Sequence, residues 1–312
     1  MSELRFRMDF EVEVTSWDEE SRTFTAIFHP DPRRYEWKEI DGKRCLYDKL
    51  DNVYFPESVF REGVRLLAGQ PIYFQPPRIE DAEAYITSRK PHIQDALEGH
   101  VHPPTFKDKS EEFLQSLAID KLAFVIISLD IIGSTKLATA TNAETYTRLV
   151  SVALYELSEI VPQFHGHVLK YTGDGLIAYF PEPSFITKND LAIDCALTLR
   201  GLVYRVLNPI LKEQGFPTIG VRIGLDAGEA HVETIGSPAT KQHKDIIGSV
   251  VSLAAKMQAR AEPGGIYLGD TVERNLHTAW RQICEPVQLV EDWDYTDLEG
   301  RVYQVHRVRL PQ

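Results

Sequence analysis

The feature that most constrains how this chain folds is a run of apolar residues that ends abruptly at a carboxylate. The run Ala123–Leu129 alternates β-branched residues and has the length of a buried strand. Asp130 ends the run, and the small residues that follow predict the start of a long helix reaching about Val161. This segment therefore predicts a strand and a helix with a carboxylate between them.

A second carboxylate, Asp174, occupies a comparable place 44 positions later. Val168–Tyr171 and Gly175–Phe180 predict a hairpin, and Asp174 lies in its tight turn. If this hairpin neighbours the first strand, Asp130 and Asp174 lie close enough to share one or two hard cations. Without a cation, two like charges at that separation would repel each other. The alternative is that both are ordinary turn aspartates, which are common beside glycines.

Polar residues accompany both carboxylates and favour a phosphorylated ligand. Gly133, Ser134 and Thr135 stand at the predicted helix start, where amides and hydroxyls suit a triphosphate. Ser252 and Lys256 are one turn apart on a later predicted helix, so they share a face. Two further charged residues belong to the same set, namely Lys170, four positions before Asp174, and Asp245, just before that later helix.

The first hundred residues follow a different pattern and contain no chemical motif. Apolar and charged residues alternate from Phe6 to Val14, the period of a half-buried strand. Short strands at Thr23–Phe28 and Tyr35–Ile40, a turn at Asp41-Gly42 and a helix from Pro56 or Glu57 to Gly69 are also predicted. No period is sustained from Pro76 to Pro104. We interpret residues 1–105 as a small α+β accessory domain for sensing, dimerisation or partner contact.

The rest of the chain is interpreted as a linker, residues 106–120, followed by a catalytic domain, residues 121–312. The linker contains a predicted short helix, Ser110–Ala118. Elements predicted after the hairpin are a helix capped by Asn189 or Asp190, a strand pair at Val221–Leu225 and Ala230–Thr234 around Gly228, a helix at Ser249–Ala261, and strands at Ile266–Leu268 and Arg301–Val308.

Composition excludes several classes of protein. The net charge of −12 argues against a non-specific nucleic-acid binder, which needs a basic face, so no nucleic-acid partner is expected. No apolar run approaches the roughly 20 residues of a membrane helix, so no membrane association is expected. The chain does not begin with the pattern of a signal peptide. Its three cysteines are far apart and odd in number, which favours a reduced, cytoplasmic protein.

Five segments together resemble the class III adenylate/guanylate cyclase catalytic domain. The resemblance covers nearly all of residues 120–309, in the order and spacing of the family. The matching segments are Phe124–Thr135, Gly166–Phe180, Val221–Ser237, Asp245–Met257 and Leu298–Val308. The resemblance implies an α+β fold with a mixed, mainly antiparallel sheet and packed helices.

The resemblance also assigns roles to the residues singled out above. Asp130 and Asp174 match the aspartates that bind two Mg²⁺ or Mn²⁺ ions, and the carbonyl of Ile131 matches the main-chain metal contact. Lys170 and Asp245 match the pair that reads the base edge. Such enzymes join the 3′-hydroxyl of a nucleoside triphosphate to its α-phosphorus and release pyrophosphate. They work as head-to-tail dimers with composite sites, so a homodimer is expected.

Two positions depart from the family pattern. Ser252 stands where purine cyclases usually have asparagine, which positions the ribose, and Lys256 where they usually have arginine. Lysine supplies charge at the reacting phosphate without the flat bidentate fork of arginine. Asp245 can accept a hydrogen bond from an exocyclic amine of the base, and Lys170 can donate to a ring nitrogen or carbonyl. This combination suits ATP or CTP better than GTP or UTP.

Several functional alternatives remain open. ATP is the leading substrate because it is the usual one in the family. The changes at Ser252 and Lys256, together with the accessory domain, also resemble bacterial pyrimidine cyclases that make cyclic CMP or cyclic UMP in anti-phage defence. A cyclase-like domain can also persist as an inactive nucleotide-binding module. A palm-fold polymerase shares the paired carboxylates, but the acidic charge disfavours a template channel.

Overall fold

The computed structural model describes residues 7–70, 75–100, 109–117, 121–181, 187–288, 293–296 and 300–310. The chain forms two compact units. Unit 1 comprises Met1–Tyr73 together with Arg274–Ile283, and unit 2 comprises Phe74–Glu273 and Cys284–Gln312. Unit 1 is thus built from two stretches that are far apart in the sequence. The domain boundary predicted at residue 105 falls outside the described residues and stays a prediction.

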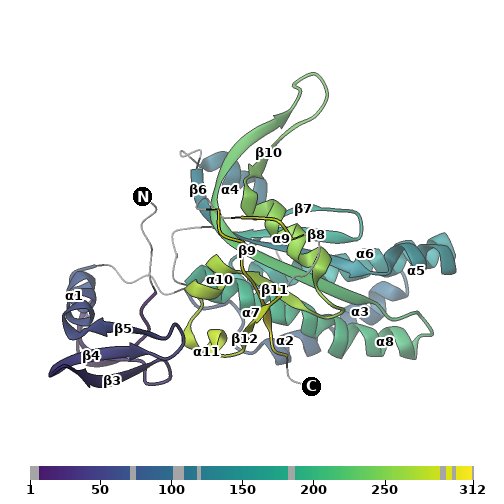
Figure 1. Cartoon of the computed structure of the whole chain (residues 1–312). Helices are drawn as coiled ribbons and strands as arrows, with labels where there is room; N and C mark the ends of the chain where they lie inside the picture. The colour runs from purple at the N-terminus through teal and green to yellow at the C-terminus, as the bar shows by residue number, and fades with distance from the viewer. Residues whose placement is uncertain are drawn as a thin grey trace. The chain divides into compact units, whose positions relative to one another are not determined.

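Unit 1 contains two small antiparallel sheets and the helices α1 and α11 (Figure 1). The residues Asp41 and Gly42 have φ of 51° and 69°, the conformation of a two-residue hairpin turn, as the sequence predicts. The two predicted strands and the helix beginning at Glu57 are also found. The elements are β1 (Phe10–Asp18), β2 (Thr23–Pro30), β3 (Tyr35–Ile40), β4 (Lys43–Asp48), β5 (Val53–Pro56), α1 (Glu57–Leu67) and α11 (Thr278–Arg281).

An apolar core and a stacked aromatic pair organise unit 1. The buried core residues are Tyr35, Leu46 and Phe60. Trp37 packs against Phe60 at a ring separation of 5.7 Å, so this tryptophan belongs to the core. Trp17 is 61% exposed and stacks on Phe24 of the neighbouring strand.

Buried ionic bonds tie the two stretches of unit 1 together. The guanidinium of Arg34 donates to three carboxylates, those of Asp9 (3.2 Å), Asp48 (2.8 Å) and Asp51 (2.9 Å). The carboxylate of Asp9 also accepts from the amide and the hydroxyl of Thr278, at 3.2 and 2.6 Å. Arg281 donates to Asp51 at 2.8 Å. The segment Arg274–Ile283 is therefore held in unit 1 by charge-assisted hydrogen bonds.

Unit 2 is built on an eight-stranded mixed sheet of order β12-β13-β11-β9-β6-β8-β7, with β10 paired to β9. Among the described strands every pair is antiparallel except β11 with β9. The predicted α+β class and mainly antiparallel sheet are therefore confirmed. The strands are β6 (Lys121–Ile132), β7 (His167–Tyr171), β8 (Gly175–Phe180), β9 (Gly220–Gly236), β10 (Gln242–Ile247), β11 (Ile266–Gly269), β12 (Cys284–Val287) and β13 (Val305–Val308).

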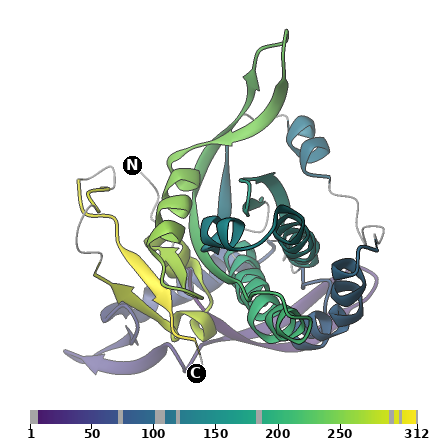
Figure 2. The same ribbon diagram turned by 90° about the vertical axis from the view of Figure 1, so that its right-hand side faces the viewer.

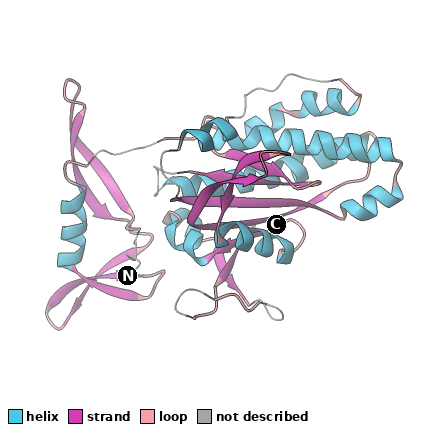
Figure 3. Cartoon of the chain, turned by 90° about the horizontal axis from the view of Figure 1, so that it is seen from above, coloured by secondary structure: helices cyan, strands magenta, loops and turns pink. Residues whose placement is uncertain are grey.

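Helices pack on this sheet (Figure 3). A Cβ on Gly224 would lie 2.2 Å from the carbonyl oxygen of Ala254, so α9 lies directly on β9. The helices are α2 (Ala82–Ser88), α3 (Lys90–Leu97), α4 (Ser110–Ser116), α5 (Ser134–Ala140), α6 (Ala143–Ile160), the 3₁₀ turn η1 (Val161–Phe164), α7 (Thr187–Gly201), the π-helical η2 (Leu202–Leu207), α8 (Asn208–Glu213), α9 (Ser249–Arg260) and α10 (Asp270–Asn275). Within the described ranges, no helix combines the length and apolar character needed to cross a bilayer.

The β9–β10 hairpin, which projects beyond the other strands (Figures 1 and 2), corrects one prediction. The sequence predicts two strands around Gly228, but β9 is continuous. It pairs with β6 from Lys121 opposite His231 to Ile132 opposite Gly220. This continuous ladder includes Gly228, so the strand is not interrupted there. The partner strand β10 was not predicted, and it contains Asp245.

Two helix predictions also need correction. The single helix predicted from residue 133 to 161 is two helices, because the side chain of Asn142 caps α6 by accepting from the amide of Thr145 at 2.8 Å. Two helices, α2 and α3, lie in the region without a sustained period. Asp81 caps α2, and Pro91 stands in the first turn of α3, where proline is tolerated.

Candidate functional site

Asp130 and Asp174 lie side by side at adjacent strand ends, as the sequence predicts. Asp130 stands near the end of β6, opposite Gly175 of β8. The amide of Ile131 donates to the carbonyl oxygen of Asp174 at 3.3 Å. Neighbouring strands and one backbone bond therefore hold the two carboxylates near each other.

Glycines shape the turn that carries Asp174. Gly173 has φ of 90°, in the left-handed region where residues with a side chain are strained. A Cβ on Gly175 would lie 2.3 Å from the carbonyl oxygen of Leu129 and 3.2 Å from the Cα of Asp130. The close approach of the turn to β6 therefore requires glycine at position 175.

The electrostatics of the pair favour a cation. Burial raises the pKa of Asp130 to about 6, and the neighbouring charge of Asp174 contributes in the same direction. A divalent cation between the two carboxylates would remove this repulsion, and carboxylate oxygens are the preferred ligands of Mg²⁺ and Mn²⁺. The donor set therefore fits the predicted metal, with the Ile131 carbonyl on the same strand.

Arg222 also belongs to this site. It stands on β9 directly opposite Asp130, and its charge lowers the pKa of that carboxyl. Its Nη1 donates to the carbonyl oxygen of Ala259 at 3.0 Å. Its buried Nε has no hydrogen-bond partner among the described residues. The signal that could have identified it is its position on a strand next to that of Asp130.

Lys170 and Asp245, the predicted base-reading residues, form an ion pair within one chain. The Nζ of Lys170 lies 2.5 Å from Oδ2 of Asp245, and the Lys170 side chain is 41% exposed. Oδ1 of Asp245 accepts from the amide of Ile246 at 2.9 Å. His243 adds a nitrogen 3.8 Å from the same carboxylate. The pair therefore presents a donor beside an acceptor, the pattern that an amine next to a ring acceptor requires.

The remaining predicted residues are exposed, except Ser134, which is half-buried. Ser252 and Lys256 share the exposed face of α9, while Val250, Ala254 and Met257 are buried on its other side. Gly133 has φ of 75° and begins α5, followed by Ser134 and Thr135. Among the described residues, no hydrogen bond or ion pair joins the Asp130–Asp174 pair to the Lys170–Asp245 pair. The structure thus brings the predicted residues together in two separate pairs.

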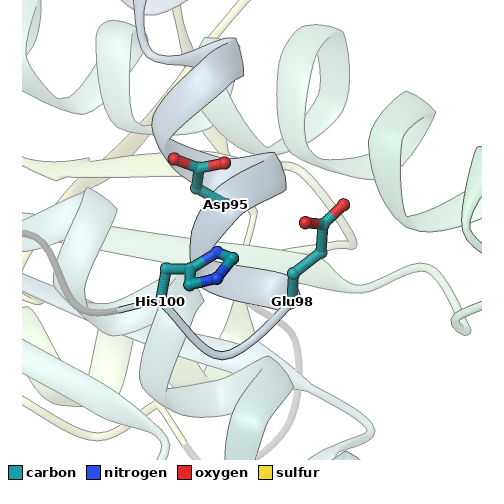
Figure 4. A group of neighbouring side chains, drawn as sticks. All are labelled: Asp95, Glu98 and His100. Atoms are coloured by element: carbon teal, nitrogen blue, oxygen red, sulfur yellow. The ribbon is translucent and has the colours of Figure 1, made fainter.

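Two other clusters of carboxylates with a histidine were not predicted. Asp95, Glu98 and His100 gather at the C-terminal end of α3 and are all exposed (Figure 4). Asp270 and Glu273 of α10 lie near His306 of β13 and are half-buried. Neither cluster includes Asp130 or Asp174, so both are separate from the paired-aspartate site.

Comparison with known proteins supplies a family for this arrangement. Residues 120–304 match the family described as the adenylate and guanylate cyclase catalytic domain. That segment includes both aspartates, the ion pair and α9.

Individual relatives are more distant. A cytidylate cyclase of Escherichia coli is 28% identical over 160 residues, which cover 49% of this chain and 35% of the relative. A putative adenylate cyclase 3 of Rhizobium meliloti is 26% identical over 152 residues, which cover 49% of this chain and 23% of the relative. This chain therefore spans well under half the length of these relatives. The crystal structure of the adenylyl cyclase CyaB from P. aeruginosa superposes with a TM-score of 0.53 at 23% identity, covering 63% of this chain and 98% of that one.

Proposed function

Because this chain belongs to the adenylate and guanylate cyclase catalytic-domain family, we propose that it converts a nucleoside triphosphate into a 3′,5′-cyclic nucleotide and pyrophosphate. The observation that carries the proposal is the juxtaposition of Asp130 and Asp174 at adjacent strand ends. In the reaction a bond forms between the 3′-oxygen and the α-phosphorus, and the bond from that phosphorus to the bridging oxygen breaks. The proton of the 3′-hydroxyl passes to solvent water, and pyrophosphate leaves.

Asp130, Asp174 and the carbonyl of Ile131 would hold Mg²⁺ or Mn²⁺, two ions per site. The metal supplies Lewis-acid activation of the hydroxyl and stabilises charge on the phosphates. Arg222 keeps the carboxyl of Asp130 available in its ionised form, because its positive charge lowers the pKa of that group.

The polar surface residues would bind the rest of the nucleotide. Gly133, Ser134 and Thr135 follow the metal aspartate in the chain and would contact the phosphates. Ser252 and Lys256 would contact the ribose and the reacting phosphate from the exposed face of α9. Removal of the positive charge at Lys256 is expected to lower turnover more than nucleotide affinity, since this charge acts on the transition state.

We propose that the active form is a homodimer in which each site draws residues from both chains. In one chain the aspartate pair and the base-reading pair are not joined, and Ser252 and Lys256 are exposed. A second chain could bring these groups to one nucleotide. Inactive variants Asp174→Ala and Asp245→Ala, when mixed, should regain about a quarter of wild-type activity if dimers form at random, because only one site of each mixed dimer is complete. Absence of any recovery would contradict composite sites.

ATP is the leading substrate, and CTP or UTP is the second candidate, with cyclic CMP or cyclic UMP in anti-phage defence as the role. The Lys170–Asp245 pair fits the amine and ring acceptor of both adenine and cytosine. The cytidylate cyclase among the relatives supports the pyrimidine alternative. The third alternative is an inactive nucleotide-binding module.

Product identification tests all three proposals. The purified chain is incubated with ATP, GTP, CTP or UTP and Mn²⁺, and the products are identified by mass spectrometry. Cyclic AMP supports the leading substrate, whereas cyclic CMP or cyclic UMP supports the pyrimidine alternative. If no triphosphate gives a cyclic product or pyrophosphate, the cyclase proposal fails and the binding module is favoured.

A further inference from the structure

Unit 2 contains a cavity of about 510 Å³ that none of the proposed catalytic residues lines. Its walls come from the C-terminal end of α6, from η1, from β7 and from two segments that precede the sheet in sequence. This volume falls in the range of small-ligand sites, which is roughly 300–1,000 Å³. The cavity can therefore hold a small organic molecule.

The charge of the lining differs from that of the chain. The whole chain carries a net charge of −12. The described residues around the cavity include two permanent cations, Arg78 and Lys109, and one carboxylate, Glu159. A local excess of positive charge in an acidic protein favours an anionic ligand.

The wall beside Arg78 is fixed in place. Nε2 of His165 lies 2.7 Å from the carbonyl oxygen of Pro76, and Nδ1 lies 3.0 Å from the side-chain Nε2 of Gln75. A carbonyl can only accept, so Nε2 of His165 donates to the carbonyl oxygen of Pro76. The permanent positive charge of the lining comes from Arg78 and Lys109. The backbone amide of Arg78 donates to the carbonyl oxygen of Gln163 at 2.7 Å, which anchors this segment.

An exposed aromatic ring completes the chemistry of the cavity. Tyr171, at the end of β7, is 54% exposed and lines the cavity. The neighbouring His167 ring packs against Phe113 and Tyr179, each at a centroid separation of 5.2 Å. Tyr171 is thus the aromatic surface that remains available for a planar ligand to stack on.

We propose that this cavity is a second nucleotide site, separate from the catalytic one, that binds a mononucleotide. Arg78 and Lys109 bind the phosphate, Tyr171 stacks on the base, and Glu159 accepts from an exocyclic amine. The shared chemistry is a single phosphate on a nucleoside, which a linear nucleoside monophosphate and a cyclic nucleotide both provide.

The position of the cavity connects it to catalysis, a step that rests on the proposed function. Tyr171 is adjacent in sequence to Lys170, and the turn with Asp174 follows. The amide of Thr172 donates to the carbonyl of Gly175 at 2.9 Å, so the end of β7 and this turn form one hydrogen-bonded unit. A ligand on Tyr171 therefore acts on the strand that carries Lys170 and on the turn that carries Asp174.

Binding without metal tests the site separately from the proposed function. Calorimetry in EDTA is carried out with AMP, CMP, cyclic AMP, cyclic CMP and inorganic phosphate. The double variant Arg78→Gln, Lys109→Gln should weaken nucleotide binding by about tenfold or more, since charge-assisted hydrogen bonds are lost. The matched control Lys212→Gln, Lys241→Gln removes two exposed cations elsewhere in unit 2 and should bind as the wild type does. Tyr171→Leu should weaken nucleotides and leave inorganic phosphate unaffected.

The outcomes distinguish the sources of the ligand and the site itself. Tighter binding of cyclic nucleotides identifies the product, and tighter binding of AMP or CMP identifies a cellular monophosphate; both support the site. Three results would overturn the proposed site. The Arg78→Gln, Lys109→Gln double variant could bind nucleotides as tightly as the wild type, Lys170→Ala could abolish binding, or inorganic phosphate could bind as tightly as nucleotides. An absence of binding at millimolar nucleotide would overturn it as well. A wild-type turnover rate that saturating monophosphate leaves unchanged would overturn the regulatory step.

Discussion

The two units bury carboxylates in opposite electrostatic settings. In unit 1 burial acts to raise the pKa of Asp9 and Asp51, but arginine charges and hydrogen bonds hold both values below the usual range. In unit 2 burial raises the pKa of Asp130 to about 6 and that of Asp226 to about 7. Unit 1 therefore supplies counter-ions to these carboxylates, whereas Asp130 and Asp226 of unit 2 are poised to bind a proton or a cation.

This difference separates structural charge from functional charge. The acidic groups of unit 1 are paired with guanidiniums at hydrogen-bond distance, and Arg34 alone contacts three of them. The charged groups that act on Asp130 are a second carboxylate, Asp174, and Arg222 on the neighbouring strand. A carboxylate whose ionised form is disfavoured in the free protein gains the most from a bound metal.

The largest effect is expected when either of the paired aspartates is replaced. Asp130→Ala and Asp174→Ala should each lower cyclic-nucleotide formation by at least about a thousandfold, because several kcal/mol of metal-dependent stabilisation are lost. Product is measured by mass spectrometry and assembly by light scattering, and dimerisation should persist. Glu213→Ala, an exposed carboxylate at the end of α8, is the control and should retain activity. Full activity in Asp130→Ala would remove the metal assignment.

The next effect tests the structural role of charge in unit 1. Arg34→Met leaves the buried Asp48 without its guanidinium and leaves Asp9 paired with Arg7 alone, which should destabilise unit 1 by about 3–5 kcal/mol. Hydrogen exchange measured by mass spectrometry should show faster exchange in β3 and β4. The control Arg65→Met removes an arginine that is 74% exposed and whose partner Glu62 is 51% exposed, so its effect should be within about 1 kcal/mol. Unchanged exchange in Arg34→Met would mean that this buried network is dispensable.

A smaller effect concerns the pH dependence of metal binding. Asp130 must lose its proton to bind a cation, so Mn²⁺ affinity should fall as the pH drops through about 6. Because Arg222 lowers the pKa of Asp130, Arg222→Gln should move the midpoint upward by a few tenths of a unit to about one unit. Calorimetric Mn²⁺ titrations between pH 5 and 8 measure this midpoint. Arg307→Gln on β13 serves as the control, and a midpoint that stays the same in Arg222→Gln would contradict the coupling.

The smallest effect is on stability. The folded-state pKa of Asp130 is raised above its usual value, so the ionised form penalises the folded protein. The penalty is absent below about pH 4 and complete above about pH 6. In EDTA at pH 8, Asp130→Asn should therefore raise Tm by about 2–4 °C, with little change at pH 4. With Mn²⁺ the order should reverse, since only the wild type binds the metal tightly. A Tm that is lower in EDTA at pH 8 would refute the electrostatic account.

Local patterns predicted the aspartate pair well and long-range pairing poorly. The apolar run before Asp130 and the glycine-rich turn at Asp174 specify strand ends that a sheet brings together. By contrast, the ladder between β6 and β9 overrides Gly228, and the cap at Asn142 divides a run that is periodic on both sides. Such outcomes depend on partners outside the local segment.

The contacts of Asp9 are a stronger case. Nothing near Asp9 in the sequence indicates that it accepts from Thr278, 269 positions away. The ion pair of Lys170 and Asp245 was likewise not predicted within one chain, because β10 was not predicted. The juxtaposition of Asp130 and Asp174 was therefore predicted from the sequence, whereas the ion pair of Lys170 with Asp245 required the three-dimensional structure.

The discontinuity of unit 1 sets an order for its assembly during synthesis. The N-terminal stretch leaves the ribosome first, but Thr278 and Arg281, which bond to Asp9 and Asp51, are made only after most of the sheet of unit 2. Until then, the carboxylates of Asp9 and Asp51 lack some of the hydrogen-bond donors that they have in the folded protein. Unit 1 is therefore expected to reach its native form late, although most of its residues precede those of unit 2 in the sequence. A nascent chain released before residue 283 should remain sensitive to protease within its first seventy residues.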